Sequence, residues 1–596
     1  MAISPGENLA KTVKYIIKSN GDDITNKYPL QAIEIRHEVN RIGEAIISVV
    51  TQGQSQSDVP ESSADDFKPG HSISISLGYG SDAKTVFEGV VVAQKIHIPR
   101  GAKSSPLLVV DCRNEAIKAT VTRRNKVYEK KKDSEAVNAA LSSCGLSADM
   151  ADTKITHTQL LQYYCTDWDF ALSRADVYGM LVTTNGSKVS IAPPKTSEPA
   201  ALKVTYGTDL LSFDGELYTE EQFTTVECTG WNSVEQKIVS ANSSPASLNK
   251  QGNISPKEMA SAAGTDTIIL QSDAQADSQV LKQWADATLL KAGLARFKGS
   301  FTFCGNASAV PGCIIELAGL GDRFNGNVFA GGVTHKVENG MWTTEVRMGI
   351  SPTNITQQPD VVAPAASGLY PGIEGLHIGV VTKLIDDPDK NNRIQVEIPV
   401  LKAKPVWVRL AQFAASKGVG SFFVPSVGDE VILGFINNDP NQAVILGCMY
   451  SSKLAPPYKL DDKNYKRGLV TPQKLQIEFD DEKKVISIIT PGKNSIILSD
   501  DAKGITLKDQ NRNEIVMDDS GIKLTSGKDI VLKAQGNVSI EATSGKLTAK
   551  AAQDASLEGI NVNVKAKVGA KVTGSATAEL SASGQTIVKG AMVMIN

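Results

Sequence analysis

The chain has 596 residues, of which 41% are hydrophobic and 21% are charged. The length is typical of three or four domains, and the composition is typical of a soluble globular protein, which excludes a disordered or collagen-like chain. The formal net charge is −3, so binding driven by nucleic-acid phosphates is not expected. Forty-nine glycines and only 6% aromatic residues favour β structure with many turns.

The cysteine pattern indicates a reducing compartment. Seven cysteines are scattered without any C-x-x-C pair, so neither a disulfide framework nor a structural zinc site is expected. The start of the chain lacks the basic and apolar regions of a signal peptide, and no apolar run reaches the ~20 residues of a membrane span. We therefore expect a protein that is cytoplasmic when assembled and leaves the cell, if at all, without a cleaved signal peptide.

Residues 1–350 mix strand and helix patterns. Strands are predicted at 72–80 and 85–98, where apolar residues alternate with polar ones. The polar stretches 53–66 and 240–258 are predicted to be mobile surface loops whose role the sequence does not indicate.

Three helices are predicted in the same part of the chain. The first begins with Asp133 or Ser134 as N-cap. The second begins at Thr166, with Asp169 three residues on, close to a capping box. The third lies within 277–299, where apolar residues recur on one helical face.

Next come a linker and a compact unit. Residues 351–376 are rich in Pro, Ala and Ser and are predicted to be a linker. In 377–450, short Val/Ile runs alternate with turn clusters, and about five strands fit, the number in an OB-type barrel. The acidic run Asp386, Asp387, Asp389 and Asn391 resembles a calcium loop, but the Gly and Glu that such a loop needs are missing. A polar turn between two barrel strands is the preferred interpretation.

After a second predicted linker at 451–472, residues 473–596 have an alternating pattern. From Ile560 to Ala582 every even position is apolar or small, while the odd positions are almost all polar, charged or Gly. Such alternation over more than twenty residues is too long for a single flat strand. From Ile522 onward the pattern falls into groups of eight residues, each a predicted short strand and bend, which indicates a β-solenoid. A long hairpin or a plain sandwich is the less favoured alternative.

Closing such a solenoid around a core requires more than one chain. Eight residues extend only ~26 Å, which is too short to encircle a hydrophobic core. Several chains wound together would each supply one wall, and three-fold symmetry is the simplest closed arrangement. We therefore expect a homotrimer with an intertwined triple-stranded β-helix.

The last residues differ from the rest of the repeat. From Ala591 to Ile595 the residues at both even and odd positions are apolar, so the polar face disappears. An apolar end on a polar rod is a candidate docking surface, or a plug that only seals the core. The candidate partner-binding residues are Ala591, Met592, Val593, Met594, Ile595 and Asn596.

No catalytic, cofactor or metal site is predicted. The chain has no G-x-S-x-G elbow, no P-loop and no H-E-x-x-H motif, and its six histidines are far apart. His335 and His377 are interpreted as core or turn residues rather than as ligands. The sequence therefore does not predict an enzyme.

Several segments resemble the VgrG spike proteins of contractile injection systems and related phage tail hubs. QYYCTDWDFALSRADVYGMLV (162–182) is similar to the hallmark of the hub, and 297–346 is similar to its end. The 377–450 unit, with VWVRLA and FFVPSVGDEVILGF, is similar to the family's OB-fold, and the C-terminal repeats are similar to its β-helix. The resemblance implies a mainly β, multidomain protein with an α+β hub of β barrels and helices at 1–350, an OB-fold neck at 377–450 and a β-helix needle at 473–596.

The resemblance also implies a function. In the family, a homotrimeric spike caps the inner tube of the injection apparatus, contacts baseplate components, pierces the target-cell envelope, and carries a PAAR-type tip protein and effector cargo. The tip protein is assigned only to Ala591–Asn596. A lysozyme domain does not fit within 451–472, and no effector domain is expected beyond Asn596.

Two alternatives remain open. One is a phage-like or surface fibre that binds a receptor, and the other is a cell-envelope hydrolase with an unrecognised site. Type VI secretion, a free extracellular particle and a prophage tail all use similar spikes, so the sequence leaves the machine, the cargo and the target cell open.

Overall fold

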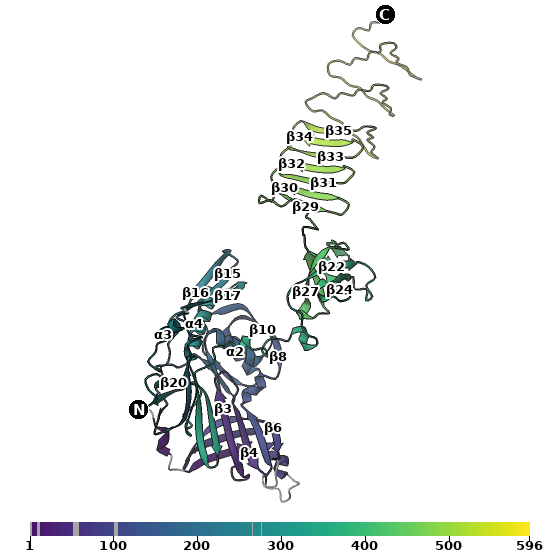
Figure 1. Ribbon diagram of the computed structural model, residues 1–596. Helices are drawn as coiled ribbons and strands as arrows, with labels where there is room; N and C mark the ends of the chain where they lie inside the picture. The colour runs from purple at the N-terminus through teal and green to yellow at the C-terminus, as the bar shows by residue number, and fades with distance from the viewer. Residues whose placement is uncertain are drawn as a thin grey trace. The chain divides into compact units, whose positions relative to one another are not determined.

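The computed structural model describes residues 3–8, 12–51, 59–99, 105–264, 266–275 and 277–595 (Figure 1). The chain divides into two compact units, residues 1–449 and 450–596, and each is described by itself. No helix within the described ranges is long and apolar enough to cross a membrane. All seven cysteines are free thiols.

A long mixed sheet organises residues 1–350. Within the described ranges thirteen strands take part, and β20 pairs with β3 to join the two ends of this region (Figure 1). The strands of this sheet are β1 (Val13–Ser19), β2 (Asp22–Asp23), β3 (Leu30–Glu38), β4 (Glu44–Val50), β5 (Ser72–Tyr79), β6 (Asp82–His97), β7 (Leu107–Arg113), β13 (Leu202–Thr205), β14 (Leu210–Leu217), β18 (Phe297–Cys304), β19 (Ile314–Ala318), β20 (Gly326–Glu338) and β21 (Met341–Met348). The strands predicted at 72–80 and 85–98 are confirmed as β5 and β6.

The sheet buries one face of each strand because its residues alternate. In β3 and β4, Ile33, Ile35 and Ile47 are fully buried, while the residues between them are partly exposed. The strands of this sheet lie in two groups joined edge to edge through β20 and β3, and neighbouring strands are antiparallel except for the parallel pair β13 and β19. The hub of β barrels and helices at 1–350 stays a prediction.

Smaller sheets and helices complete the same region. The sheets are β8 (Arg123–Lys132) with β10 (Thr156–Thr166); β9 (Ser147–Met150) with β11 (Leu181–Asn185) and β12 (Lys188–Ala192); and β15 (Thr225–Asn232) with β16 (Lys237–Asn242) and β17 (Thr267–Gln275). The α-helices are α1 (Asp133–Ser142), α2 (Asp167–Val177), α3 (Pro256–Ala263) and α4 (Ser278–Leu294). The short 3-10 helices of the chain are η1 (Pro5–Asn8), η2 (Pro60–Ser63), η3 (Asp65–Phe67), η4 (Glu115–Ala119), η5 (Ile355–Gln357), η6 (Ala365–Gly368), η7 (Pro399–Leu401) and η8 (Ile436–Asn438).

The helix caps follow the prediction at α2 but not at α1. Thr166 caps α2 by accepting a hydrogen bond from the Asp169 backbone N–H at 3.0 Å. The prediction of Asp133 or Ser134 as N-cap is wrong, because Asp133 is the first helical residue and is fully buried.

Asp133 instead joins α1 to β10, to α2 and to the residue that follows α2. Its carboxylate accepts hydrogen bonds from Arg174 Nε at 2.5 Å and Tyr178 Oη at 2.6 Å, and His157 Nε2 lies 2.7 Å away. Burial opposes ionisation of this carboxyl, but Arg174, Tyr178 and His157 outweigh burial and hold the pKa of Asp133 below its ordinary value.

The predicted loop at 240–258 is wrong at its two ends, while residues 243–255 form neither helix nor extended strand. Its start completes β16, and its end is a capping box in which Ser255 and Glu258 exchange hydrogen bonds at the start of α3. Between them, Asn249 is buried and accepts a hydrogen bond from the buried Arg296 at 3.1 Å. The sequence contained the Ser-Pro-x-Glu signal of this helix, but the polar composition of the stretch obscured it.

The other predicted loop, 53–66, is described only in part. Residues 52–58 lie outside the described ranges, while η2 and η3 occupy the remainder.

The segment 351–376 is attached at both ends. In its first half, the Ile355 backbone N–H donates to Asp176 at 2.7 Å, and Arg123 donates to the carbonyl of Asp360 at 2.7 Å. In its second half, the backbone N–H of Ile373 donates to the carbonyl of Asn438 at 2.9 Å. The stretch that the sequence predicts to be a linker is therefore held by hydrogen bonds in both of its halves.

A closed five-stranded barrel follows. Its strands are β22 (His377–Lys383), β23 (Ile394–Glu397), β24 (Val406–Leu410), β27 (Glu430–Phe435) and β28 (Ala443–Cys448). Val396, Val431 and Ile445 are fully buried at its centre. The predicted five-stranded OB-type unit is confirmed. A short hairpin of β25 (Ala415–Ser416) and β26 (Val419–Gly420) projects from it.

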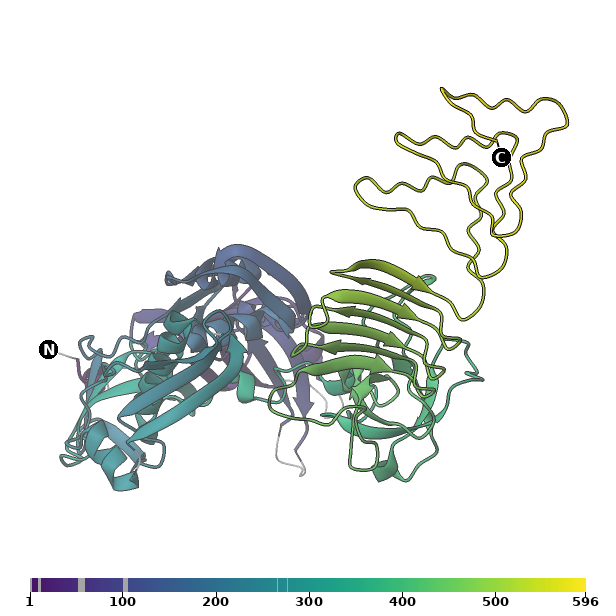
Figure 2. The ribbon, with the colours of Figure 1, turned by 90° about the horizontal axis from the view of Figure 1, so that it is seen from above.

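The second unit begins with a meander of short strands. Within its described residues, seven antiparallel strands pair in chain order: β29 (Lys466–Val470), β30 (Gln476–Asp480), β31 (Val485–Ile489), β32 (Ser495–Ser499), β33 (Gly504–Lys508), β34 (Glu514–Asp518) and β35 (Gly521–Thr525). Figure 2 shows these strands stacked as a ladder. The first of them, β29, lies within 451–472, the stretch expected to be a linker.

The turns of this ladder share one backbone feature. Lys474, Lys484, Lys493, Lys503 and Arg512 all have positive φ values between 50° and 72°. A residue in this left-handed conformation after a type I turn is a common way to close a hairpin, and it fixes the strand register. The repeated turn keeps equivalent residues of successive strands aligned.

Beyond the ladder the chain has no paired strands. The described residues 526–595 form neither helix nor strand (Figure 2), and the side chains of 527–595 are exposed. Of the predicted groups of eight residues, the first, which begins at Ile522, has its short strand in β35, whereas the strands predicted for the later groups are not formed by a single chain. The physical reason is that one chain offers these strands no neighbour to pair with.

The buried histidine of the long sheet predicts acid destabilisation. Burial, with a smaller contribution from His37, lowers the pKa of His335 to about 3. An unfolded histidine binds a proton below about pH 6.5, whereas the folded His335 stays neutral until about pH 3. The contribution of His335 to the free energy of unfolding is therefore complete above pH 6.5. It is lost as the pH falls toward 3, by up to about 1.4 kcal/mol per pH unit.

The measurement is urea denaturation monitored by tryptophan fluorescence between pH 7 and pH 4. His335→Gln retains a group that can bond to Thr344, which contacts His335 Nδ1 at 2.9 Å. This variant should show a shallower loss of stability with falling pH. Equal slopes in the variant and the unmodified chain would contradict the assignment.

Candidate functional site

The most prominent candidate surface is one face of the β29–β35 ladder. Successive strands place apolar residues directly opposite one another in two columns. The first column is Leu469, Ile477, Ile488, Ile496, Leu507, Ile515 and Leu524, and the second is Phe479, Ile486, Leu498, Ile505, Met517 and Ile522. We call these thirteen residues the apolar ladder face.

The apolar ladder face is not covered by its own chain. Ile488 is 41% exposed, Ile496 is 40% exposed and Ile522 is 69% exposed. A groove of about 380 Å³ lies over it, lined in part by Ile488, Ile496 and Ile515. Contiguous apolar surface on this scale marks an interaction site. Most of these side chains are only about two fifths exposed. Full burial of an exposed side chain contributes about 1.5–3 kcal/mol, so covering the exposed remainder of all thirteen would contribute on the order of 10 kcal/mol per chain.

The opposite face of the ladder has a different character. It carries ion pairs, such as Lys466 with Glu478 at 2.5 Å and with Asp480 at 2.9 Å, alongside Ser487 and Ser495. One side of the sheet therefore suits water, and the other suits a second apolar surface.

The alternation between apolar and polar residues continues into the groups of eight residues that follow the ladder. The even positions predicted to be core are exposed in the single chain, including Ile560, Val564, Val568 and Val572. At the end of the chain Met592, Val593, Met594 and Ile595 are also exposed, while Asn596 lies outside the described residues. The predicted tip residues are thus accessible as far as Ile595.

A third apolar patch lies on the β25–β26 hairpin of the barrel. Phe413, Phe422 and Phe423 are exposed, and Phe413 is fully so. The hairpin is ordered by Gln412, whose Nε2 donates to the Phe423 carbonyl at 3.0 Å, and by the backbone N–H of Ser421, which donates to the Ala414 carbonyl at 2.9 Å.

The residues considered as ligands in the sequence have structural partners. His335 contacts Thr344, and His377 Nε2 lies 3.1 Å from the Glu374 carbonyl. In the acidic run, Asp387 accepts hydrogen bonds from Arg393 Nη2 at 2.7 Å and from the Asn391 backbone N–H at 2.7 Å. The interpretation of this run as a polar turn between barrel strands is confirmed. Hydrogen bonds from Arg393 hold the pKa of Asp387 well below its ordinary value.

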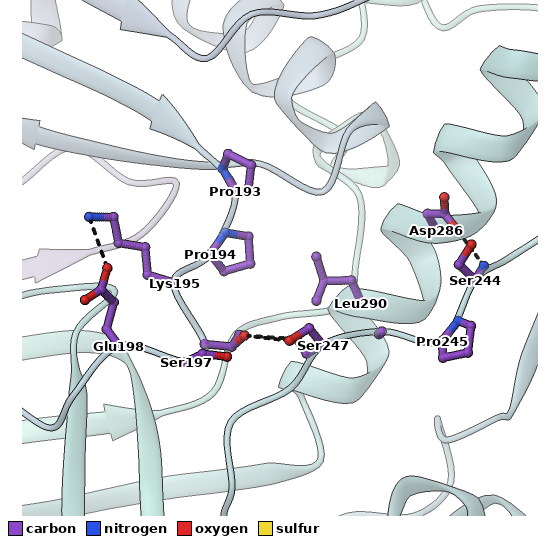
Figure 3. A pocket seen from close by; sticks show the side chains of 12 residues that line it. Pro193, Pro194, Lys195, Ser197, Glu198, Ser244, Pro245, Ser247, Asp286 and Leu290 are labelled. Atoms are coloured by element: carbon purple, nitrogen blue, oxygen red, sulfur yellow. Dashed lines mark hydrogen bonds and ion pairs between the residues drawn. The ribbon is translucent and has the colours of Figure 1, made fainter.

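A metal centre is not seen in the described part of the chain, because no group of three or more His, Cys, Asp or Glu side chains there is arranged to hold an ion. The groove shown in Figure 3 lies between the segment from Pro193 to Glu198, the segment from Ser244 to Ser247, and Asp286 and Leu290 of α4. Asp286 accepts a hydrogen bond from the Ser244 backbone N–H at 2.6 Å. The groove has no histidine or cysteine in its lining, and its ionisable side chains are Lys195, Glu198 and Asp286.

Sequence reasoning missed the apolar ladder face and the aromatic hairpin. The signal for the first was present, because IEF, ISI and ITL each alternate within a short strand. Apolar residues such as Ile489 and Ile497 on the opposite face blurred the alternation. The hairpin gave no signal, since exposure of Phe422 and Phe423 depends on how the barrel closes.

Comparison with known proteins adds three family matches. The Alg8 N-terminal domain matches residues 9–339. The type VI secretion system/phage-baseplate injector OB domain matches 377–450, and the phage baseplate V C-terminal trimerisation domain matches 485–548. The last of these covers most of the apolar ladder face.

Curated relatives match over shorter segments. The type VI secretion system spike protein VgrG3 of Vibrio cholerae is 45% identical over 65 residues, which cover 11% of this chain and 6% of that protein. The spike protein VgrG5 of Pseudomonas aeruginosa is 41% identical over 54 residues, which cover 9% of this chain and 7% of that protein. The matched segments thus span less than a tenth of the length of these two relatives.

Solved structures give weaker likenesses. The 43 kDa tail protein of prophage MuSo2 from Shewanella oneidensis has a TM-score of 0.44 at 10% identity, covering 57% of this chain and 99% of that one. The c3393 protein of E. coli, a type VI secretion component, has a TM-score of 0.38 at 13% identity, covering 73% of this chain and 99% of that one. At these TM-scores neither likeness adds weight to the assignment of function.

The class of protein defined by the OB domain, the trimerisation domain and the curated relatives is the VgrG-type spike of injection machines and phage baseplates. The Alg8 N-terminal domain family matches more than half of this chain, so the chain belongs to that family.

The acidic turn predicts that calcium has no effect on the barrel. Both carboxylate oxygens of Asp387 already accept hydrogen bonds from Arg393 or from backbone N–H groups. Added Ca²⁺ should leave the melting temperature of the protein unchanged, as measured by calorimetry. Asp387→Asn should speed amide hydrogen exchange at Asn391 and Arg393, measured by mass spectrometry. A calcium-dependent rise in melting temperature would show instead that the run binds the ion.

Proposed function

We propose that this chain is the trimeric spike at the tip of a contractile injection apparatus. In this role it caps the inner tube, contacts the baseplate, pierces the target envelope, and carries a tip protein and effectors. The role is mechanical rather than catalytic. Its domains are a hub at 1–350, an OB-fold neck at 377–450 and a needle in the remaining C-terminal part.

The observation that supports this proposal best is the uncovered apolar ladder face. A single sheet with one apolar face is not stable alone in water, and three copies related by a three-fold axis would bury all three faces against one another. The match to a trimerisation domain over 485–548 supports the same arrangement. The exposed even positions of residues 526–595 would then continue the core of the trimer.

Piercing is a consequence of this construction. Strands that pair between chains leave no free edges, and a dry, closely packed core of small side chains resists deformation. Pairing would also satisfy the backbone of residues 526–595, which has no strand partner within one chain. A rod of this kind can transmit an axial push without buckling.

The proposed partners follow the order of the chain. The hub would contact inner-tube and baseplate proteins, in line with the match of the next domain to an injector OB domain. The exposed Met592, Val593, Met594 and Ile595 support docking of a PAAR-type tip protein at the needle end, to which Asn596 is also assigned. The remaining proposed partners are effector cargo and the target-cell envelope.

The proposed location is the cytoplasm during assembly and the injection particle afterwards. Seven free thiols suit a protein that folds under reducing conditions. Delivery by the machine would replace a signal peptide.

Trimer formation is tested by a charge on the apolar ladder face. Ile496 lies between Ile488 and Leu507 in the first column. Ile496→Asp should weaken assembly at least about 100-fold, because an unpaired buried charge costs about 3–5 kcal/mol. Light scattering after size exclusion should give three chain masses for the unmodified protein and one for the variant.

The matched control is Ser495→Asp, which introduces the same charge one residue away on the opposite face, beside Lys508. It should remain a trimer. Val564→Asp and Val568→Asp extend the test to the groups of eight residues and should also abolish trimers. Unchanged trimers in the Ile496 variant would remove the main support for the spike.

Tip docking is tested by making the end of the needle polar. Met592→Ser with Met594→Ser removes two exposed apolar side chains and should weaken binding of a PAAR-type protein at least about tenfold, at about 1.5–3 kcal/mol per buried Met. Isothermal titration calorimetry of the trimer provides the measurement. Gln585→Ser with Lys589→Ser, just before the tip, should bind as the unmodified chain does. Full binding by the Met variant would leave the tip residues as a simple plug.

A further inference from the structure

The charges of the C-terminal unit are unevenly distributed. The ladder, residues 466–525, has ten basic and ten acidic side chains, and residues 526–558 have four of each. Residues 559–578 have three lysines, Lys565, Lys567 and Lys571, and no acidic residue. From 579 to the end one acidic and one basic residue balance again. Of the excess of four positive charges in residues 450–596, three therefore lie in this one stretch of twenty residues, which we call the lysine collar.

The three lysines lie on the water-facing side of the repeat. They occupy odd positions, while the even positions of the same stretch are apolar or small from Ile560 to Ala578. In the structure all three lysines are exposed. They stay outside the core whether or not the chains wind together.

The collar lysines also differ from those of the ladder in their partners. In the ladder, Lys466 pairs with Glu478 and Asp480, and Lys508 lies 3.9 Å from Glu514. Within the described residues none of the three collar lysines forms an ion pair, and no carboxylate lies in the collar sequence to provide one. Their ammonium groups are free to bind an external anion.

We propose that the lysine collar binds the anionic phospholipid head groups of a membrane surface. This inference rests on the proposed trimeric spike, in which three chains bring nine lysines together around one short length of needle. Juxtamembrane lysines are attracted to anionic lipid surfaces by about 1 kcal/mol each, close to fivefold in affinity per residue. The collar lies near the chain end that would meet the envelope first.

The same observations disfavour nucleic acid as the occupant. Residues 480–596 contain no aromatic side chain on which a base could stack, and 513–596 contain no arginine to read a base edge. Lysine supplies a point charge for a phosphate without base recognition.

The test uses the full-length protein and vesicles. Flotation with vesicles of 30% phosphatidylglycerol in phosphatidylcholine should recover the protein, and flotation with pure phosphatidylcholine should not. Binding should fall as NaCl is raised from 0.1 to 1 M, because the Debye length shrinks from about 10 to about 3 Å. The triple variant Lys565→Gln, Lys567→Gln and Lys571→Gln should bind at least about tenfold more weakly.

The matched control removes the same charge from the balanced segment upstream. Lys528→Gln, Lys533→Gln and Lys546→Gln should retain most of the vesicle binding. Equal losses in the two triple variants, no vesicle binding by a trimeric unmodified chain, or binding to duplex DNA but not to vesicles would each overturn the proposal.

Light scattering on every sample separates this proposal from the spike itself. A trimer that fails to bind vesicles overturns the collar alone. A monomer that binds vesicles through the three lysines overturns the trimer and supports the collar. A monomer that does not bind overturns both.

Discussion

A sheet that is apolar on one face cannot exist alone in water, and this constraint governs the C-terminal part of the molecule. The apolar ladder face presents thirteen aligned apolar side chains to solvent within one chain. The stretch that follows has apolar residues at every other position and no strand partner. Both observations indicate an interface that further copies of the chain would complete, so the proposed function depends on assembly rather than on a cavity.

The strand register aligns the apolar side chains of this face. Repeated left-handed turns at Lys474, Lys484, Lys493, Lys503 and Arg512 keep the two apolar columns straight across the ladder. A slip of one residue in any turn would move the apolar residues of the next strand to the opposite face and bring polar residues such as Glu478, Ser487 or Ser495 onto the apolar one. The turns therefore specify the interface as firmly as the apolar residues do.

The sequence predicted the parts whose signals are local. The five-stranded barrel was predictable because short Val/Ile runs and turn clusters alternate within 75 residues, and the α2 cap was predictable because Thr166 and Asp169 are three residues apart. The long sheet was not predictable, since β3 and β20 pair residues such as His37 and Val333 that are about 300 positions apart. Asp133 looked like a helix cap because its burial depends on Arg174, which only the tertiary fold brings near.

The candidate site divides in the same way. The apolar alternation of the last residues was evident, because it persists over many positions. The ladder face was not, because five-residue strands give too few positions to distinguish two faces when both carry some isoleucine. The contacts of the predicted linker were not evident for a related reason, since composition alone does not reveal that Asp176 and Asn438 bind the backbone of 351–376.

That docked segment gives the molecule a very short joint. Contacts attach the chain on one side as far as Val361, through Arg123, and on the other side from η6 onward, where Asn437 Nδ2 donates to Ser367 at 2.9 Å. Only Val362, Ala363 and Pro364 lie between these attachments, and the φ of Pro364 is held at −64° by its ring. Any change of direction between the attached segments therefore has to come from the backbone torsions of these three residues, and the proline ring removes one of them.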